Sequence, residues 1–389
     1  MALNSVTLSA AVRQNLLSLQ GTADLLSQTQ ERLATGKSVN SALDNPTNFF
    51  TAAGLDARAS DISNLLDSIG NGVQVLQAAN TGITSLSSLV DTAKSIANQV
   101  LQQPSGFTTH STSTSSALVG TASAANLVDG AGIKSGETIS FAASGTLPAL
   151  TVTFGATESL AQLNTALAPG DLTASINSTN QLVFTTTNDA AGSTIGAIVA
   201  TGAGSTTFAA GTAPVADPVS QATRSSLVTQ YNQILTQITT TAQDASFNGI
   251  NLLNGDELKL VFDETGKSTL TISGVTFNPA GLGLSSLTAG TDFIDNNTTN
   301  NVLAALNTAS VTLRSQASAF GANLSIVQIR QDFNKNIINV LQTGSSNLTL
   351  ADANEEAANS QALSTRQSIA TSALALANQS QQNVLQLLR

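Results

Sequence analysis

Cysteine and tryptophan are absent from this chain of 389 residues, histidine occurs once, and charged residues make up only 10% of the sequence. In an ordinary soluble domain roughly a quarter of the residues are charged. Without cysteine there is no disulfide framework, no thiolate nucleophile and no Cys/His set for zinc or an iron–sulfur cluster. A single histidine leaves little room for a His-centred metal site or a supported imidazole base. We therefore expect no cofactor, no metal and no enzymatic activity.

The charge balance and the hydropathy limit the partners of the chain. Its net charge of −10 argues against nucleic-acid binding, which depends on Lys and Arg to neutralise phosphates. No stretch approaches the roughly 18–20 apolar residues that a membrane span needs. The segment Met1–Ser5 lacks the basic and apolar regions of a secretory signal peptide. If the protein is exported, we expect a route without a cleaved signal peptide.

Apolar residues near both ends of the chain recur with alternating steps of four and three residues. This spacing holds over residues 12–33, 62–101 and 306–341. It averages about 3.5 residues, which is typical of a coiled-coil seam and differs from the wider apolar face of a globular helix. The sequence therefore predicts long helices in both terminal regions.

Glycines lie inside the second of these predicted helices and directly after the third. Gly70, Gly72 and Gly82 fall in the second, where each costs about 1 kcal/mol relative to alanine, and we still expect one long helix. After the third, Gly344-Ser345-Ser346 predicts a break, and a further helix is expected from about Leu350.

The middle of the chain has a different composition. Lys134 is the only Lys or Arg between residues 104 and 218, where Gly, Ser, Thr and Ala predominate. The Ser/Thr-rich stretch around His110 indicates a solvated linker, and a helix is expected over residues 227–238. Clusters of β-forming residues between Gly, Asn and Asp predict strands. The expected strands are Glu137–Phe141, Leu150–Phe154, Leu172–Ile176 and Gln181–Thr187, with a short helix at Ser159–Leu167 and a later hairpin at Leu258–Phe262 and Thr269–Val275.

A coiled coil with few charges on its outer face is unusual, because charges at the e and g positions normally fix partner and orientation. Ser, Thr, Asn and Gln in their place form a surface that other copies can cover at modest desolvation cost. Such helices bury little apolar area as a pair, so they should be marginal alone and become ordered on assembly. We expect a self-association core in which Leu16, Leu19, Leu26 and Leu33 pair with Ile369, Leu376, Val384 and Leu387.

Three segments resemble bacterial flagellin. Residues 31–46, ERLATGKSVNSALDNP, are similar to the signature of flagellin N-terminal regions. Phe247–Leu253, FNGINLL, resembles the F-N-G segment of the family, and Gln382–Arg389, QNVLQLLR, is similar to its C-terminal ending. The signature positions are Glu31, Arg32, Gly36, Asn40, Asp44, Phe247, Asn248, Gly249, Leu388 and Arg389.

The resemblance implies a mainly α fold with an inserted β-rich domain. The terminal regions, residues 1–42 and 345–389, would form a core domain of long antiparallel coiled-coil helices. Residues 43–103 and 219–344 would form a helical shell domain with a β-hairpin, and residues 104–218 a variable outer domain of α+β type. In common flagellins the outer domain follows the hairpin, so its position between the first and second shell helices is a departure.

The resemblance also implies a function. The chain would be a structural subunit that polymerises with itself, or with other flagellins, into the extracellular filament of the bacterial flagellum. Its further partners would be an export chaperone, the cap and the hook-associated proteins, after export through the flagellar type III apparatus. Two alternatives remain open: a hook–filament junction protein of the same family, and a secreted adhesin whose activity lies in residues 104–218.

One further segment of the family binds a vertebrate innate receptor, and it aligns with residues 90–99. Here the aligned residues include Val90, Thr92, Lys94 and Ser95, with Thr92 and Ser95 standing where the family usually has Arg and Glu. We therefore expect weak recognition by that receptor.

Overall fold

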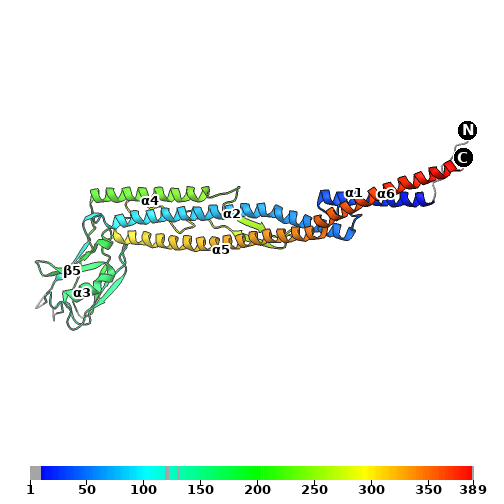
Figure 1. Ribbon diagram of the computed structural model, residues 1–389. Helices are drawn as coiled ribbons and strands as arrows, with labels where there is room; N and C mark the ends of the chain where they lie inside the picture. Colours follow the sequence, from blue (N-terminus) through cyan, green and yellow to red (C-terminus); the bar gives the residue numbers. More distant parts are fainter. Residues whose placement is uncertain (1–9, 119–121, 129–131, 203, 205, 388–389) are drawn as a thin grey trace. The chain divides into compact units, whose positions relative to one another are not determined.

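The computed structural model describes residues 10–118, 122–128, 132–202, 204 and 206–387. The chain divides into two compact units. The terminal unit draws on residues 1–70, 260–270 and 327–389, and the central unit on residues 71–259 and 271–326. Long helices dominate both units, and most strands lie in a segment inserted between α2 and α4 (Figure 1). The expected mainly α fold with an inserted β-rich domain is confirmed.

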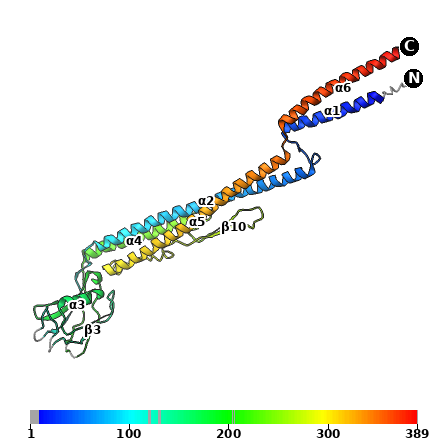
Figure 2. The ribbon, with the colours of Figure 1, turned by 60° about the horizontal axis from the view of Figure 1, so that its bottom comes forward.

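In the terminal unit, α1 (Ala10–Thr35) and α6 (Ala353–Leu387) lie side by side and run in opposite directions (Figure 2). The same unit contains the first part of α2 (Pro46–Leu101) and the last part of α5 (Asn296–Thr349). A small buried cluster lies between these two helices and consists of Ala59, Ile62 and Leu341.

The predicted break at Gly344-Ser345-Ser346 is wrong, because α5 continues as a helix to Thr349. Ser345 and Thr349 are buried, and Thr349 Oγ1 donates a hydrogen bond to the Ser345 carbonyl at 3.0 Å. A Cβ atom at Gly344 would stand 3.4 Å from Leu55 Cδ1 on α2. Packing against α2 therefore outweighs the local helix cost of about 1 kcal/mol for a glycine. By contrast, α2 is unbroken, as predicted.

In the central unit, α4 (Pro218–Asp244) lies beside α2 and α5 (Figure 1). Asp217 caps α4, since its carboxylate accepts a hydrogen bond from Val219 N at 3.2 Å, and Pro218 occupies the first turn, where no amide hydrogen is needed. The facing apolar side chains are fully or nearly fully buried, and they include Ile83, Leu86, Leu227, Ile238, Leu306 and Leu313.

The predicted hairpin is confirmed as β9 (Glu257–Val261) and β10 (Thr269–Ser273). Asp263 stabilises the turn, because its carboxylate accepts a hydrogen bond from Ser268 N at 2.9 Å. Gly266 has a φ of +71°, a left-handed conformation that glycine adopts without strain.

The insert contains two antiparallel sheets of three strands, in the orders β2-β6-β5 and β4-β3-β7. A further short pair, β1 with β8, lies where the chain enters and leaves the insert. The strands are β1 (Phe107–Thr109), β2 (Thr112–Ala117), β3 (Thr138–Phe141), β4 (Leu150–Thr153), β5 (Leu172–Ile176), β6 (Gln181–Thr186), β7 (Ile198–Thr201) and β8 (Val215–Ala216).

A short helix, α3 (Leu160–Leu167), covers the core of the insert. Ser159 and Gln162 form a capping box at its start, which explains why the helix begins where the sequence predicts. The buried core combines α3 with both sheets and includes Leu127, Ile139, Phe141, Phe154, Leu163, Leu167, Leu182 and Phe184. Two single-turn helices complete the insert, η1 (Ala168–Gly170) and η2 (Asn188–Ala190).

The solvated linker predicted around His110 is wrong. His110 lies between β1 and β2, with its Nδ1 atom 2.7 Å from the Thr186 carbonyl oxygen. Ser111 and Ser113 beside it are buried, and Ser113 Oγ donates a hydrogen bond to the Ala209 carbonyl at 2.7 Å. Hydroxyl groups that find partners can line a buried strand, so the Ser/Thr-rich composition alone was misleading here.

Candidate self-association site

One face of α1 packs against one face of α6, and we call this contact the seam. On α1 the less exposed positions follow steps of three and four residues, and Leu16, Leu19 and Leu26 are half-buried there. The seam positions of α6 keep steps of four and three throughout, at Glu356, Ser360, Leu363, Gln367, Ala370, Leu374 and Ala377. Since only two of these α6 residues are large and apolar, the seam buries little apolar area.

Within a single chain, Ile369 and Leu376 do not pack against the α1 leucines, so the predicted pairing remains a prediction for contacts between copies. Their side chains are 64% and 73% exposed. Successive positions on a helix are separated by about 100°, so Ala370 and Ala377, one residue later, take the places that face α1. Leu33 is also exposed, at 43%. The side chains of Val384 and Leu387, and the signature residues Leu388 and Arg389, lie outside the described part of the chain.

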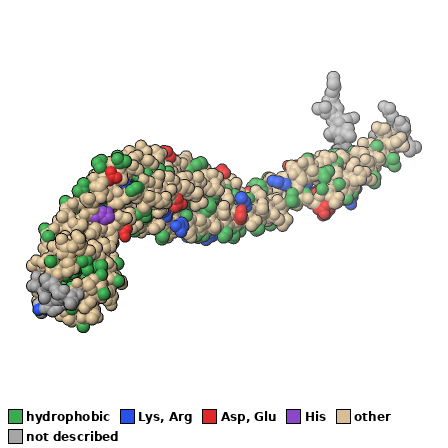
Figure 3. Space-filling view, turned by 90° about the vertical axis from the view of Figure 1, so that its left-hand side faces the viewer, with side chains coloured by type: hydrophobic (Ala, Val, Ile, Leu, Met, Phe, Trp, Pro, Cys, Tyr) green, Lys and Arg blue, Asp and Glu red, His purple; other side chains and the backbone are tan. Residues whose placement is uncertain are grey.

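We use the name outer stripe for the exposed large apolar residues of the two helices; on α1 they are eight residues apart, so each is turned by about 80° from the one before. It consists of Leu17, Leu25 and Leu33 on α1 and of Ile369 and Leu376 on α6. On α6 the stripe lies opposite the seam and lines an open groove of about 450 Å³, together with Thr365, Ser368, Ser372 and Ala373. Figure 3 shows how few Lys, Arg, Asp and Glu side chains occupy the visible surface of the chain.

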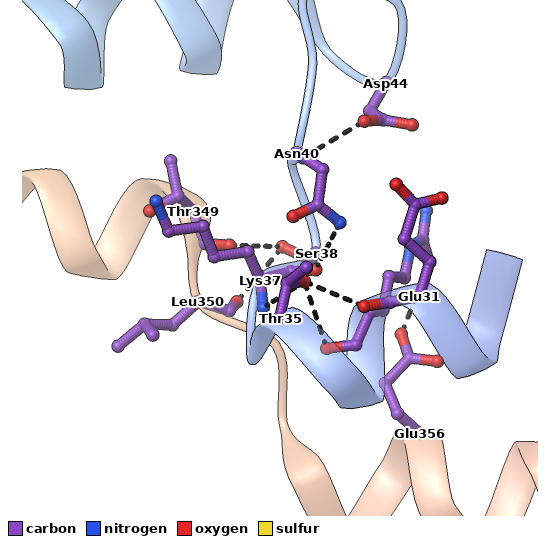
Figure 4. Close-up of polar contacts among 10 residues, drawn as sticks. Glu31, Thr35, Lys37, Ser38, Asn40, Asp44, Thr349, Leu350 and Glu356 are labelled. Carbon is purple, nitrogen blue, oxygen red and sulfur yellow. Dashed lines mark hydrogen bonds and ion pairs between the residues drawn. The ribbon is translucent and has the colours of Figure 1, made fainter.

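The connectors that join α1 to α2 and α5 to α6 are held together by hydrogen bonds, a contact that we call the connector clasp (Figure 4). Ser38 N donates to the Thr349 carbonyl at 2.7 Å, and Ser38 Oγ donates to the Leu350 carbonyl at 3.0 Å. Lys37 and Leu350 form an isolated antiparallel β-bridge. The clasp therefore consists of Lys37, Ser38, Thr349 and Leu350, of which only Lys37 and Ser38 lie inside the flagellin-like segment.

Two signature residues, Arg32 and Gly36, fix the end of α1 at this clasp. Gly36 has a φ of +68° and ends the helix, and its carbonyl accepts a hydrogen bond from Ala351 N at 3.0 Å. Arg32 Nη1 lies 3.3 Å from Glu356 Oε1. Arg32 stands in the last turn of α1 and Glu356 in the first turn of α6, so each charge also faces the helix end whose dipole it complements.

The signature residues Asn40 and Asp44 build the connector between α1 and α2. One carboxylate oxygen of Asp44 accepts hydrogen bonds from Ser41 N at 2.8 Å, from Asn40 N at 3.0 Å and from Ser41 Oγ at 3.1 Å. The Ser41 amide, followed by the other hydrogen bonds, lowers the pKa of the Asp44 carboxyl. Asn40 Nδ2 donates to the Lys37 carbonyl at 3.2 Å. Glu31, in contrast, uses its carbonyl inside α1 and leaves its side chain exposed.

The F-N-G segment is a turn in the central unit and takes no part in the seam. Phe247 and Ile250 exchange two backbone hydrogen bonds of 3.0 Å each. Asn248 and Gly249 between them have φ values of +50° and +80°, the conformation for which Asn-Gly is the preferred pair. Asn251 Nδ2 then donates to the Ala242 carbonyl near the end of α4 at 2.8 Å. The motif thus ends α4 and starts the path to the hairpin.

The receptor-like segment lies on α2, and its four residues differ in accessibility. Val90 is fully buried in the helical core. Lys94 donates from Nζ to Ser310 Oγ at 2.7 Å, so its ammonium group is engaged within the chain. Thr92 and Ser95 are exposed. The Thr92 hydroxyl donates to the Ser88 carbonyl at 2.9 Å, so of the four residues Ser95 is the exposed one whose side chain has no hydrogen bond assigned among the described residues.

The described residues also bear on the expected absence of metals and membrane spans. Among them, no group of three or more His, Asp or Glu side chains is placed to hold a metal ion. No helix in the same part of the chain is long and apolar enough to cross a membrane.

Two family descriptions match the sequence. Residues 4–130 match the "Bacterial flagellin N-terminal helical region", and residues 303–388 match the "Bacterial flagellin C-terminal helical region". Together the matches include all of α1, α2 and α6, most of α5 and the start of the insert.

Curated relatives match over part of their length. Flagellin FljM of Caulobacter vibrioides is 30% identical over 164 residues, which are 42% of this chain and 59% of the relative. Flagellin FljK of the same bacterium is 29% identical over 164 residues, with the same shares of 42% and 59%. Flagellin A of Rhizobium meliloti is 34% identical over 88 residues, or 23% of this chain and 22% of the relative. The chain therefore spans less than two thirds of the length of each of these relatives.

Proposed function

Because the chain belongs to the bacterial flagellin family, we propose that it is a structural subunit that polymerises with copies of itself, or with other flagellins, into the helical filament of the flagellum. The observation that carries this proposal is the outer stripe, where five large apolar side chains of α1 and α6 are exposed on a single chain. Large apolar side chains left in water on a regular helical surface are typical of a protein-interaction surface.

The composition of the stripe supports an open polymer. Its α1 part, Leu17, Leu25 and Leu33, differs from its α6 part, the groove beside Ile369 and Leu376. Contact between two different patches is heterologous, and such contacts produce an open helix when the rotation between subunits does not close. This is the symmetry that a filament needs.

We extend the proposal to the division of labour along the chain. Residues 1–42 and 345–389 would form the filament core, residues 43–103 and 219–344 the shell around it, and residues 104–218 the outer domain. An extracellular location, type III export without a cleaved signal peptide, and partners among the chaperone, cap and hook-associated proteins rest on family membership alone. The role is structural, not enzymatic.

Seeded polymerisation tests the proposal. Purified chain would be added to sheared filament fragments and followed by electron microscopy, using the parent, Leu376→Asp and the control Ser364→Asp. Leu376 lies in the outer stripe, whereas Ser364 is an exposed polar position of α6 outside both the stripe and the seam. Both substitutions add one carboxylate at an exposed site, so circular dichroism of the monomers should match the parent.

We expect long tubes from the parent, tubes from Ser364→Asp, and monomers from Leu376→Asp. Growth of Leu376→Asp at the parental rate would remove the outer stripe from the proposal. If the parent itself produced only monomers or short caps on these seeds, the filament role would fail and the junction-protein alternative would gain support.

A further inference from the structure

The insert joins the ends of three shell helices at one place within the central unit. The chain leaves α2 at Leu101, passes through the insert, and enters α4 at Pro218, while the segment before Asn296 leads into α5 beside these two connections (Figures 1 and 2). A tethered outer domain would have two loose linkers here. Hydrogen bonds instead join these segments, and some are made by the buried side chains of Arg224 and Asp295.

The two connections are bonded to each other and to α4. Gly106 in the outgoing connection accepts hydrogen bonds from Asp217 N at 2.9 Å and from Gln221 Nε2 at 2.8 Å. A Cβ atom at Gly106 would lie 2.3 Å from Gln221 Nε2 and 3.2 Å from the Ile294 carbonyl oxygen. An alanine here would displace the Gln221 side chain from its hydrogen bond with Gly106 and crowd the Ile294 carbonyl.

Arg224 of α4 ties the outgoing connection to the segment that precedes α5. Its side chain is 2% exposed. The guanidinium donates to the Pro104 carbonyl from Nε at 3.3 Å and from Nη2 at 3.0 Å, and to the Phe293 carbonyl from Nη1 at 2.8 Å. A buried guanidinium whose donors reach carbonyls on two different segments holds those segments at a fixed separation.

The first residues of α5 then reach into the insert itself. Asn296 Nδ2 donates to Asp189 Oδ1 at 2.9 Å, and Asn297 Nδ2 donates to Asp171 Oδ2 at 2.6 Å. Asp171 has a φ of +53° and ends η1, and Asp189 lies in η2, so both carboxylates are presented by tight turns. Negative charge beside the start of a helix is also favoured by the helix dipole.

Asp295, the residue before α5, adds a buried contact. It is 1% exposed, and its Oδ1 caps the helix by accepting from Thr298 N at 3.0 Å. Its Oδ2 accepts from Thr146 Oγ1 of the insert at 3.3 Å, and that hydroxyl lies 2.8 Å from Ser193 Oγ. One carboxylate thus caps a shell helix and bonds the outer domain.

We propose that these contacts lock the insert onto the start of α5, so that the outer domain and the shell helices move as one rigid body. Three segments of the insert, at Thr146, at Asp171 and at Asp189, are bonded to the cap of α5 and to its first two residues. Three anchor points that are not collinear remove both the bending and the twisting freedom of a joint. When the shell helices rotate, the outer domain should therefore rotate with them by the same angle and at the same time.

The absence of cysteine makes distance measurements by spin labelling straightforward. Labels on Thr151→Cys in the insert and Gln237→Cys on α4, both exposed positions, report the separation of the two parts by pulsed electron resonance. The test variant is Asn296→Ala/Asn297→Ala, which removes two anchors but leaves Arg224 and Asp295 intact, so that folding is retained. The matched control is Asn300→Ala/Asn301→Ala, a pair of exposed asparagines one turn later on the same helix.

We expect a single narrow distance in the labelled parent and in the control, and its loss to a broad distribution in the test variant. A broad distribution in the parent would overturn the proposal, because the outer domain would then be swinging on its connections. A distribution that stays narrow after Thr146→Val is added to the test variant would also overturn it, since no anchor from α5 to the insert side chains would remain. Circular dichroism of each variant confirms that the fold is intact.

Discussion

Gly82 provides a test in which two known effects have opposite signs. It lies in the middle of α2, where a glycine costs about 1 kcal/mol relative to alanine, so Gly→Ala would ordinarily stabilise the helix. A Cβ atom at this position, however, would lie 2.5 Å from Leu253 Cδ1 and 2.7 Å from Ala245 Cβ. Leu253 is fully buried and Ala245 has no side-chain freedom, so neither can move away without disturbing the core.

The magnitudes decide the sign of the effect. Adding a methyl group to a well-packed site costs about 1–3 kcal/mol, against a gain of about 1 kcal/mol in helix propensity. Gly82→Ala should therefore lower the free energy of unfolding by up to about 2 kcal/mol. Gly54 in the same helix has no atom within 4 Å of the Cβ position, so Gly54→Ala should raise it by up to about 1 kcal/mol.

Urea unfolding followed by circular dichroism measures both variants against the parent, and hydrogen exchange of the α2 peptides around each glycine localises the effect. The reasoning is refuted if Gly82→Ala stabilises the chain as much as Gly54→Ala does. Such a result would mean that the F-N-G turn, which presents Ala245 and Leu253 to α2, yields at little cost.

Three further predictions concern single groups or helices. Tyr231 is the only tyrosine and there is no tryptophan, so its phenol can be titrated by absorbance. Burial, and then the Asp292 charge, raise the pKa of this phenol to about 12, so the free energy of unfolding should fall as the pH rises from about 10 through about 12. A midpoint near pH 10 for the native phenol would contradict this prediction. The hydrogen bonds of Asp44 lower the pKa of its carboxyl group. Its contribution to stability is therefore present above the unfolded pKa of 3.8 and is lost as the pH falls through the lower folded pKa. Asp44→Asn should flatten the acid unfolding curve of the terminal unit. Amides of α1 and α6 should exchange faster than those of α2 in the monomer and slow down on polymerisation, and equal rates in both states would argue against ordering on assembly.

Local sequence signals predicted the helices and the strands β3 to β6, β9 and β10, because periodicity and turn residues act over short distances. They missed β1, β2, β7 and β8. The capping box at Ser159 and Gln162 and the Asn-Gly pair at residues 248–249 both produce the structures that their residue types favour. The pairing of strands into β2-β6-β5 and β4-β3-β7 depends on contacts between residues far apart in the chain, and no local pattern contains it. The errors at His110 and at Gly344 have the same origin, since tertiary hydrogen bonds and packing outweighed composition there.

The candidate site was predicted less completely than the fold. A seven-residue pattern identifies the apolar helices. On α6, however, two sets of positions one residue apart both contain apolar residues. The prediction followed the set with the larger side chains, Ile369 and Leu376, whereas the other set faces α1 within the chain. Alanines at 370 and 377 take the seam because they allow close approach of the helices. The clasp partners Thr349 and Leu350 had no signal at all, because only their backbone carbonyls take part.

The clasp has a further consequence for the outer stripe. The seam specifies its register weakly, because a shift by one heptad puts leucine in the place of leucine on α1 and alanine in the place of alanine on α6. The Ser38–Thr349 hydrogen bond and the Arg32–Glu356 ion pair remove that ambiguity at one end, since neither survives a shift of about 10 Å along the helix. Once the register is fixed, the leucines of α1 and the groove of α6 have a fixed spacing along the pair. Signature residues that hold α1 and α6 of one chain in register therefore determine the surface that we propose for contact with a neighbouring copy.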